Sequence, residues 1–110
     1  MAIRFVLARS GEQYSFFLKT LAQSRTLLVS EPFPSEAEAR RGIDAVRANA
    51  SFEGRYERCR AASGQSYFVL KGRKGEPLGR SEMYPSGHAR NEGIVAVKAY
   101  APMASVVEET

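Results

Sequence analysis

The residues of this sequence that could act as a nucleophile or a base are few. The 110 residues include one cysteine, Cys59, and one histidine, His88. A cysteine and a histidine within hydrogen-bond reach can form a nucleophile–base pair, but Cys59 also fits a small strand residue and His88 a surface residue in a first helical turn. We favour the second interpretation. No spacing of histidine and cysteine matches a metal-ligand set, so the sequence predicts no catalytic residue, no metal and no cofactor.

Two further features have both a chemical and a structural interpretation. Glu31 and Glu82 stand at equivalent places in two similar segments, so a twofold arrangement could bring them together as a carboxylate pair. Alternatively, each glutamate binds a local backbone N–H or a neighbouring arginine where a strand joins a helix. The glycine-flanked basic segment 72–75 lacks the Gly-Lys-(Ser/Thr) ending of a phosphate-binding loop. It is typical of a solvated hairpin turn.

Basic and aromatic side chains are interleaved in the second half of the chain. Basic groups contact phosphates, and aromatic side chains on a sheet can stack on unpaired bases. The candidate residues for such a nucleic-acid patch are Arg55, Arg58, Arg60, Lys71, Arg73, Lys74 and Tyr67. Their neighbour Phe68 matches Phe16 of the first half and is expected in the core. Because the first half has fewer basic residues in its corresponding strands, the patch is not a repeated feature.

Composition limits the class of protein. The formal net charge is +4 at pH 7, which permits an anionic partner without requiring one. Seven basic residues stand against five acidic ones in residues 1–51, and nine against seven in residues 52–110. The apolar runs are far shorter than the ~20 residues of a transmembrane helix, and the first residues lack a signal-peptide pattern. We therefore expect a cytoplasmic protein with no membrane partner and, with one cysteine, no internal disulfide.

The sequence repeats itself at an interval of 51 or 52 residues. Segment 30–35, Ser-Glu-Pro-Phe-Pro-Ser, returns as Ser-Glu-Met-Tyr-Pro-Ser at 81–86. Gly-Ile-Asp-Ala-Val-Arg-Ala at 42–48 returns as Gly-Ile-Val-Ala-Val-Lys-Ala at 93–99. Internal similarity of this kind marks a repeated structural unit. The sequence therefore predicts repeat one at residues 1–51 and repeat two at residues 52–110.

Each repeat carries signals for three strands followed by a helix. The predicted strands lie at 3–9, 14–18 and 27–30 in repeat one, and at 55–61, 67–71 and 78–81 in repeat two. Gly-containing turns follow the first strand of each repeat and the second strand of repeat two. Ser35 and Ser86 are placed to cap the following helices, and a final short strand is predicted at 105–108.

One unit of about 50 residues has a marginal core and leaves an open strand edge, which pairing with the other unit removes. We therefore predict one α+β domain spanning residues 1–110. Its two tandem repeats share one antiparallel-rich sheet, related by a pseudo-twofold axis, with both helices on one face.

The doubled pattern Ser-Glu-x-(aromatic)-x-Ser, followed by Gly-Ile-x-x-Val-(Arg/Lys), resembles the YegP-like proteins, a bacterial family built on the domain of unknown function 1508. The resemblance implies two β-β-β-α-β units whose C-terminal strands are exchanged between the repeats. It implies that 52–61 contains a strand closing the first unit and opening the second, and that 104–107 closes the last. The family supplies no reaction, substrate or catalytic residue. This chain departs from it at Glu36 and Gly87, where a lysine is common, and at the end of the second helix.

A sheet covered by helices on one face leaves its other face open. Strand alternation prevents Tyr14, Phe17, Tyr67 and Val69 from all pointing inward, so some apolar surface is expected on that face. Exposed apolar patches usually mark contact with a partner. The sequence therefore favours a non-enzymatic binding or protein-interaction module with a protein partner or a homo-oligomeric state. The alternative is single-stranded nucleic-acid binding through a basic and aromatic sheet face.

Overall fold

The structure, a computed structural model, describes residues 3–22 and 25–109. Residues 1–2 and 23–24 of the predicted repeat one, and residue 110 of repeat two, lie outside the described residues. The strands are β1 (Ile3–Ser10), β2 (Gln13–Thr20), β3 (Thr26–Val29), β4 (Tyr56–Arg60), β5 (Ser66–Lys71), β6 (Pro77–Arg80) and β7 (Ser105–Glu109). The α-helices are α1 (Glu36–Asn49) and α2 (Gly87–Tyr100), and the short 3₁₀ helices are η1 (Glu53–Arg55) and η2 (Ala101–Met103).

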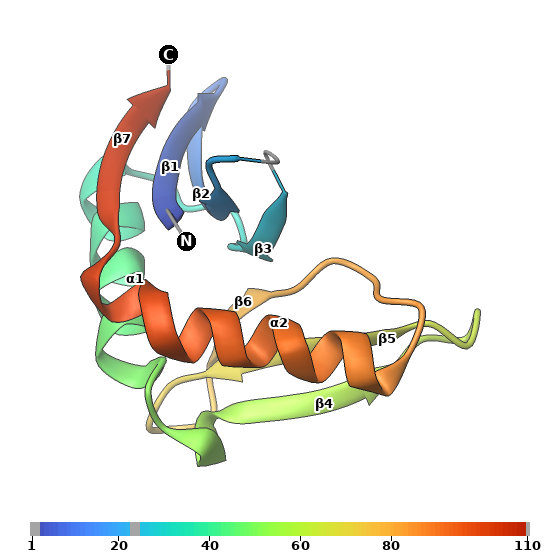
Figure 1. The fold of residues 1–110 in the computed structure, drawn as a ribbon. Coiled ribbons are helices and arrows are strands. Elements are labelled where there is room, and N and C mark those ends of the chain that lie inside the picture. Colours follow the sequence, from blue (N-terminus) through green and yellow to red (C-terminus); the bar gives the residue numbers. More distant parts are fainter. Residues whose placement is uncertain (1–2, 23–24, 110) are drawn as a thin grey trace.

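The seven strands form one mixed sheet in the order β4-β5-β6-β3-β2-β1-β7, which confirms the predicted α+β class. Every pair of neighbours is antiparallel except β1 and β7. The two meanders, β1–β3 and β4–β6, join at a single register pair, Val29 with Arg80. Figure 1 shows the strands of the two meanders running in different directions on either side of this seam.

Glycines permit the tight turns between strands. Gly11 in the β1–β2 turn, Gly64 in the β4–β5 turn and Gly75 in the β5–β6 turn have φ angles of 62°, 91° and 82°. A side chain is strained in this left-handed region, and glycine is not. The three turns lie where the sequence predicted them.

Both helices begin at the predicted serine caps. The Ser35 hydroxyl accepts a hydrogen bond from the Glu38 N–H at 3.2 Å, and the Ser86 hydroxyl accepts one from the Ala89 N–H at 3.1 Å. Each bond satisfies a backbone donor that the first helical turn leaves without a partner. The sequence departs from the family pattern at the end of the second helix, yet both helices have 14 residues.

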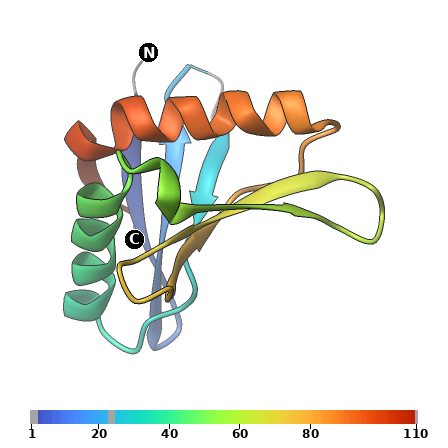
Figure 2. The same ribbon diagram turned by 90° about the horizontal axis from the view of Figure 1, so that it is seen from below.

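The core lies on one face of the sheet, between the strands and both helices. It includes Phe5, Phe16 and Leu18 from the first meander and Phe68 and Leu70 from the second. The helices add Ile43, Val46, Ile94 and Val97. Figure 2 shows α1 and α2 bordering the strands along two adjacent sides, with their axes strongly inclined to one another. No helix in the described part of the chain has the length and apolar character needed to cross a bilayer.

The two outer strands of the sheet pair with their neighbours in different directions. β7 follows α2 in the chain but pairs in parallel with β1, so that Val106 lies beside Phe5 and Val107 beside Val6. The chain that leaves α1 passes through η1 into β4, which pairs with β5. Within residues 3–22 and 25–109, β4 and β7 each lack a partner strand on their outer edge.

Candidate binding surface

The repeated Ser-Glu segments hold the strands to the helices. The Ser30 hydroxyl accepts a hydrogen bond from the Phe16 N–H at 2.8 Å and donates one to the Glu31 carbonyl at 2.9 Å. Ser81 makes the same two bonds with Phe68 and Glu82, each at 2.9 Å. Both serines are buried, and a buried backbone N–H needs such a partner. These bonds give a structural reason why the Ser-Glu segment recurs in both halves of the chain.

The aromatic residue of each segment packs under a helix. Phe33 stacks on Phe16 with ring centroids 6.1 Å apart, and Tyr84 stacks on Phe68 at 6.4 Å. A Cβ atom at Gly42 would lie 2.8 Å from Phe33 Cζ. A Cβ atom at Gly93 would lie 2.7 Å from Tyr84 Cζ and overlap its hydroxyl. The mid-helix glycines therefore permit each helix to approach the aromatic ring closely.

The structure gives Glu31 and Glu82 different surroundings. The Glu82 carboxylate pairs with the Arg25 guanidinium at 3.1 Å, as one of the two sequence interpretations expects. Glu31 lines a hollow at the seam between β3 and β6, to which Glu82 does not contribute. The two carboxylates therefore do not share a site.

Cys59 and His88 also have separate partners. The Cys59 thiol lies 3.7 Å from the Glu57 carbonyl on the same strand. His88 lies in the first turn of α2 with 88% of its side chain exposed, 3.6 Å from Glu92. Within the described residues, no group of three or more His, Cys, Asp or Glu side chains could hold a metal ion.

The seven residues of the candidate nucleic-acid patch are divided between two faces and a turn. Tyr67 and Lys71 extend from the open face of the sheet, and Lys71 pairs there with Glu57 at 3.2 Å. Arg58 and Arg60 lie on the helix side of β4, where Arg58 binds Glu53 at 2.7 Å. Arg55 lies before β4 and donates to Asn49. Arg73 and Lys74 lie in the exposed β5–β6 turn.

A row of directly paired residues crosses the open face of the whole sheet. Strand pairing places them side by side, with side chains on the same face, in the order Val107, Val6, Phe17, Val29, Arg80, Val69 and Glu57. We call this set the cross-sheet row. Its apolar members are buried or half-buried, and Arg80 and Glu57 are exposed. Alternation along each strand puts the core on one face and this row on the other.

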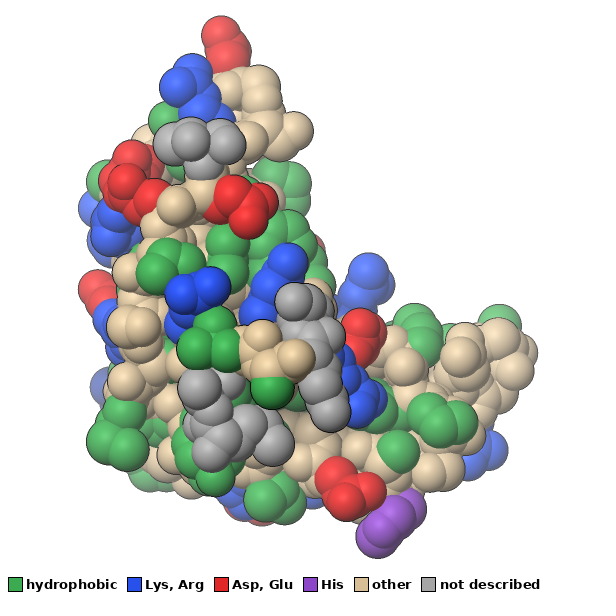
Figure 3. Space-filling model, turned by 45° about the horizontal axis from the view of Figure 1, so that its top comes forward, with side chains coloured by type: hydrophobic (Ala, Val, Ile, Leu, Met, Phe, Trp, Pro, Cys, Tyr) green, Lys and Arg blue, Asp and Glu red, His purple; other side chains and the backbone are tan. Residues whose placement is uncertain are grey.

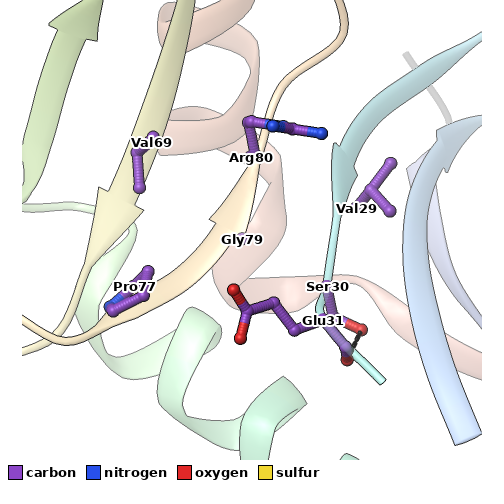
Figure 4. Close-up of a pocket in the computed structure, with 7 residues that line it drawn as sticks. All are labelled: Val29, Ser30, Glu31, Val69, Pro77, Gly79 and Arg80. Carbon is purple, nitrogen blue, oxygen red and sulfur yellow. Dashed lines mark hydrogen bonds between the residues drawn. The ribbon is translucent and has the colours of Figure 1, made fainter.

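The centre of the cross-sheet row is hollowed. A depression of about 250 Å³ is lined by Val29, Ser30, Glu31, Val69, Pro77, Gly79 and Arg80. Figure 4 shows Val69, Arg80 and Val29 extending from three neighbouring strands, with the Glu31 carboxylate directed toward the strand that carries Gly79. The site therefore offers apolar side chains together with one cation and one anion.

Further charged side chains lie on both faces of the sheet. Figure 3 shows two arms that meet at a hollowed corner, around which hydrophobic and cationic side chains gather. On β2, next to the row, the Lys19 ammonium lies 5.3 Å from the centroid of the Phe17 ring.

On the helix side of β4, hydrogen bonds from Arg58 and Lys98 lower the pKa of Glu53 to about 2. Burial raises the pKa of Tyr56, whose hydroxyl donates to the Ala50 carbonyl.

Comparison with known proteins places the chain in a family. A UPF0339 protein of Bordetella pertussis is 42% identical over 96% of this chain and 95% of its own length. The UPF0339 protein YegP of Escherichia coli K12 is 38% identical over 100% of both chains. This chain belongs to the UPF0339, YegP-like family. The family model matching residues 61–108 is described as a domain of unknown function, DUF1508. The resemblance seen in the sequence is therefore confirmed.

Two solved structures of the UPF0339 family share the fold. The solution structure of yegP from E. coli, described as a protein of unknown function, has a TM-score of 0.90 at 38% identity. It covers 100% of this chain and 95% of its own. The solution structure of a UPF0339 protein from Shewanella oneidensis has a TM-score of 0.89 at 30% identity, covering 98% and 92% of the two chains.

Sequence reasoning identified Phe17 and Val69 but missed Arg80 and Val29, which complete the centre of the cross-sheet row. Period-two alternation in the short strands β3 and β6 was the available signal. These strands have four residues each, too few to show which side faces the core. Their pairing across the seam is long-range and has no local sequence signature.

Proposed function

We propose that this chain is a non-enzymatic binding module, built from two tandem repeats related by a pseudo-twofold axis, whose open sheet face binds a protein partner. A second copy of the chain is the first partner to test. The repeat interpretation is supported by the Ser30 and Ser81 bonds, the Ser35 and Ser86 caps and the two aromatic stacks, which recur at an interval of 51 or 52 residues. The pairing of β7 with β1 supports exchange of the C-terminal strand.

The observation that carries the binding proposal is the cross-sheet row. Its five valine and phenylalanine side chains lie on the face of the sheet that neither helix covers. Four of them, from Val107 to Val29, are consecutive, and Arg80 separates these four from Val69. An apolar strip on a polar surface is typical of a partner contact. In a twofold dimer, Arg80 of one copy could meet Glu31 of the other across the hollow, so the surface is self-complementary in charge.

A protein partner fits these residues better than a nucleic acid. The hollow at the centre of the open face is lined by Val29 and Val69. The aromatic side chains of this face, Phe17 and Tyr67, lie on β2 and β5 with two strands between them, whereas successive unpaired bases stack on neighbouring aromatic platforms. Arg58 and Lys71 of the predicted patch are paired with carboxylates. A non-enzymatic role is supported by the separate surroundings of Cys59 and His88.

The experiment is light scattering over a wide range of protein concentration. The native chain is expected to form a concentration-dependent dimer, and Val69→Lys to shift it toward monomer by placing a charge in the row. Val95→Lys is the matched control, because Val95 is 64% exposed on α2, away from the row. A native chain that stays monomeric at millimolar concentration, or equal dissociation of both variants, would contradict the self-association.

Retention on single-stranded RNA at graded salt tests the alternative. Phosphate contacts make affinity fall steeply as salt rises. We expect no retention even at low salt. Retention that weakens with salt and is lost in the double variant Arg58→Ala with Arg60→Ala would support nucleic-acid binding instead.

A further inference from the structure

β1 and β4 occupy corresponding places in the two halves of the molecule, but only β1 has a strand on its outer side. Phe5 on β1 packs edge-on against Phe16, and Tyr56 on β4 packs edge-on against Phe68. The outer side of β1 is paired in parallel with β7. Among the described residues no strand lies on the outer side of β4, and Figure 1 shows β4 near the lower margin of the molecule. The second half therefore lacks the strand that completes the first.

The backbone of Arg58 and Arg60 faces this open side. Antiparallel strands exchange hydrogen bonds at every second residue pair. Ala61, which follows β4, donates its N–H to the carbonyl of the residue that precedes β5, so Arg58 and Arg60 lie between the residues that bond to β5. Tyr56 agrees with this alternation, because its N–H donates to the Glu53 carbonyl in η1. Two N–H groups and two carbonyls, those of Arg58 and Arg60, are thus directed toward an added strand.

β7 shows which side chains a completing strand carries. On the helix side of the sheet, Val106 packs against the core beside Phe5, and Glu108 lies beside Leu7. Arg40 of α1 pairs with the Glu108 carboxylate. The strand that completes the first half therefore presents an acidic side chain to a cation of the neighbouring helix.

The second half carries cations at the corresponding place. From the pairing of each strand with its neighbour, Arg58 of β4 corresponds to Leu7 of β1. Arg58 is already paired with Glu53. Arg60 is exposed on the same side of β4, and the Arg90 guanidinium of α2 lies 3.4 Å from a backbone carbonyl of this strand. None of the ion pairs among the described residues involves Arg60 or Arg90, so both are available to an acidic side chain.

A second copy of β4 fits this edge poorly. Antiparallel pairing about a twofold axis centred on Arg58 would place that arginine opposite itself. An axis centred on Cys59 would place Arg58 opposite Arg60, and one centred on Glu57 would place two glutamates opposite each other. Like charges directly opposite one another destabilise a strand pair. The edge thus resists pairing with its own copy, as open edges must, whereas an acidic strand meets no such repulsion.

We propose that the outer edge of β4 binds an extended acidic segment of a partner protein, which adds to the sheet as a parallel strand. The segment forms backbone hydrogen bonds with Arg58 and Arg60, and its acidic side chains lie on the helix side near Arg60 and Arg90. Main-chain bonds give strand addition its affinity, and side chains give it specificity. This edge is a second surface, at the end of the sheet and apart from the hollow at the centre of the cross-sheet row.

The test is an amide-resolved NMR titration of the full chain with the capped peptide Ser-Val-Glu-Val-Glu-Val-Ser, at low and constant ionic strength. We expect saturable shifts at the amides of Arg58 and Arg60 and slower hydrogen exchange at both, because their N–H groups become bonded. The amides of Glu57 and Cys59, which face β5, should keep their exchange rates.

Two control peptides separate charge from backbone pairing. A peptide with lysines in place of the glutamates keeps the backbone and reverses the charge. A peptide N-methylated at its three valines keeps both carboxylates and loses the N–H groups that would face β4, because a parallel strand bonds through the residues on either side of the one in register. Neither control should give saturable shifts.

Variants of Arg60 test the edge from the protein side. Arg60→Gln should raise the dissociation constant about two- to fivefold, the usual range for an exposed ion pair. Arg60→Pro also removes the outward N–H and should raise it at least about tenfold. Proline is tolerated at such a position, since this N–H makes no bond to β5. Arg9→Gln is the matched control, because Arg9 corresponds to Arg60 on the covered strand β1, and it should leave binding unchanged.

Several results would overturn the proposal. These are the absence of saturable shifts with the acidic peptide, equal binding of either control peptide, and unchanged binding in Arg60→Gln. Exchange at the Arg58 and Arg60 amides that slows when the free chain is concentrated, with no peptide present, would assign the edge to a second copy and would also overturn it.

Discussion

The two halves of the molecule can be compared contact by contact, and they differ where each helix meets its aromatic residue. Phe33 and Tyr84 stack in the same way on Phe16 and Phe68. Phe33 is half-buried, whereas Tyr84 is fully buried and its hydroxyl has no hydrogen-bond partner among the residues that the structure describes. The serine bonds and helix caps do not differ. The comparison teaches that the shared contacts maintain the fold, while the residues that differ are candidates for function.

The linkage at the end of each helix also differs. Arg47 near the end of α1 donates to the backbone carbonyl of Ala104 at 2.6 Å. Lys98, at the corresponding place in α2, pairs with the Glu53 carboxylate at 2.7 Å. A backbone carbonyl does not titrate and a carboxylate does, so only the second linkage depends on pH.

The largest expected effect tests whether both halves share one core. Phe16→Ala and Phe68→Ala should each lower the free energy of unfolding by about 3–5 kcal/mol, the usual loss for a buried phenylalanine. Urea denaturation should show one cooperative transition in each variant. Hydrogen exchange that accelerates only in the mutated half would contradict a common core.

The buried serines should have equal effects in the two halves. Ser30→Ala and Ser81→Ala each leave a buried N–H without an acceptor, that of Phe16 or Phe68. The expected loss is about 1–3 kcal/mol in either variant, measured by chemical denaturation. If the two losses differed by more than about 1 kcal/mol, the serine contacts would not be equivalent.

The mid-helix glycines should have unequal effects. Alanine favours the helix by about 1 kcal/mol over glycine, but overpacking costs about 1–3 kcal/mol. Gly93→Ala meets the fully buried Tyr84, so we expect a net loss of about 2 kcal/mol. Gly42→Ala meets the half-buried Phe33 at 2.8 Å and the buried Phe16 at 2.9 Å. Both contacts are less severe than the overlap of a Gly93 Cβ with the Tyr84 hydroxyl, so the loss for Gly42→Ala should be smaller. Thermal denaturation of both variants checks the order, and an equal or larger loss for Gly42→Ala would contradict it.

The smallest expected effect is the pH dependence of Glu53. Hydrogen bonds from Arg58 and Lys98 lower the pKa of Glu53 from 4.5 to about 2. Its contribution to stability is therefore present above pH 4.5 and is lost as the pH falls toward 2. Glu53→Gln should be slightly less stable than the native chain at pH 7, with a difference that disappears over this range. Denaturation at several pH values measures it, with Arg47→Gln as the comparison from the other half. A difference that persists at pH 2 would exclude titration of Glu53 as its cause.

Local signals in the sequence predicted the elements of this fold well. Ser35 and Ser86 act on the first turn of their own helices, and Gly11, Gly64 and Gly75 act within their own turns. Contacts between segments that are distant in the sequence were harder to predict. The basic residues 55–74 looked like one patch in the sequence, yet alternation and the β5–β6 turn separate them. Arg25 gave no signal, because its partners Tyr84 and Glu82 lie more than fifty residues away.

The sequence by itself determined the class of fold, the positions of the caps and turns, and the family, because each depends on local spacing or on a doubled motif. Only the tertiary structure decided which side chains share a surface. The cross-sheet row depends on the seam between β3 and β6, and the close contact between Tyr84 and Gly93 depends on α2 lying over the Tyr84 ring. Both arise from packing between distant segments, whose geometry is fixed only when the common core forms.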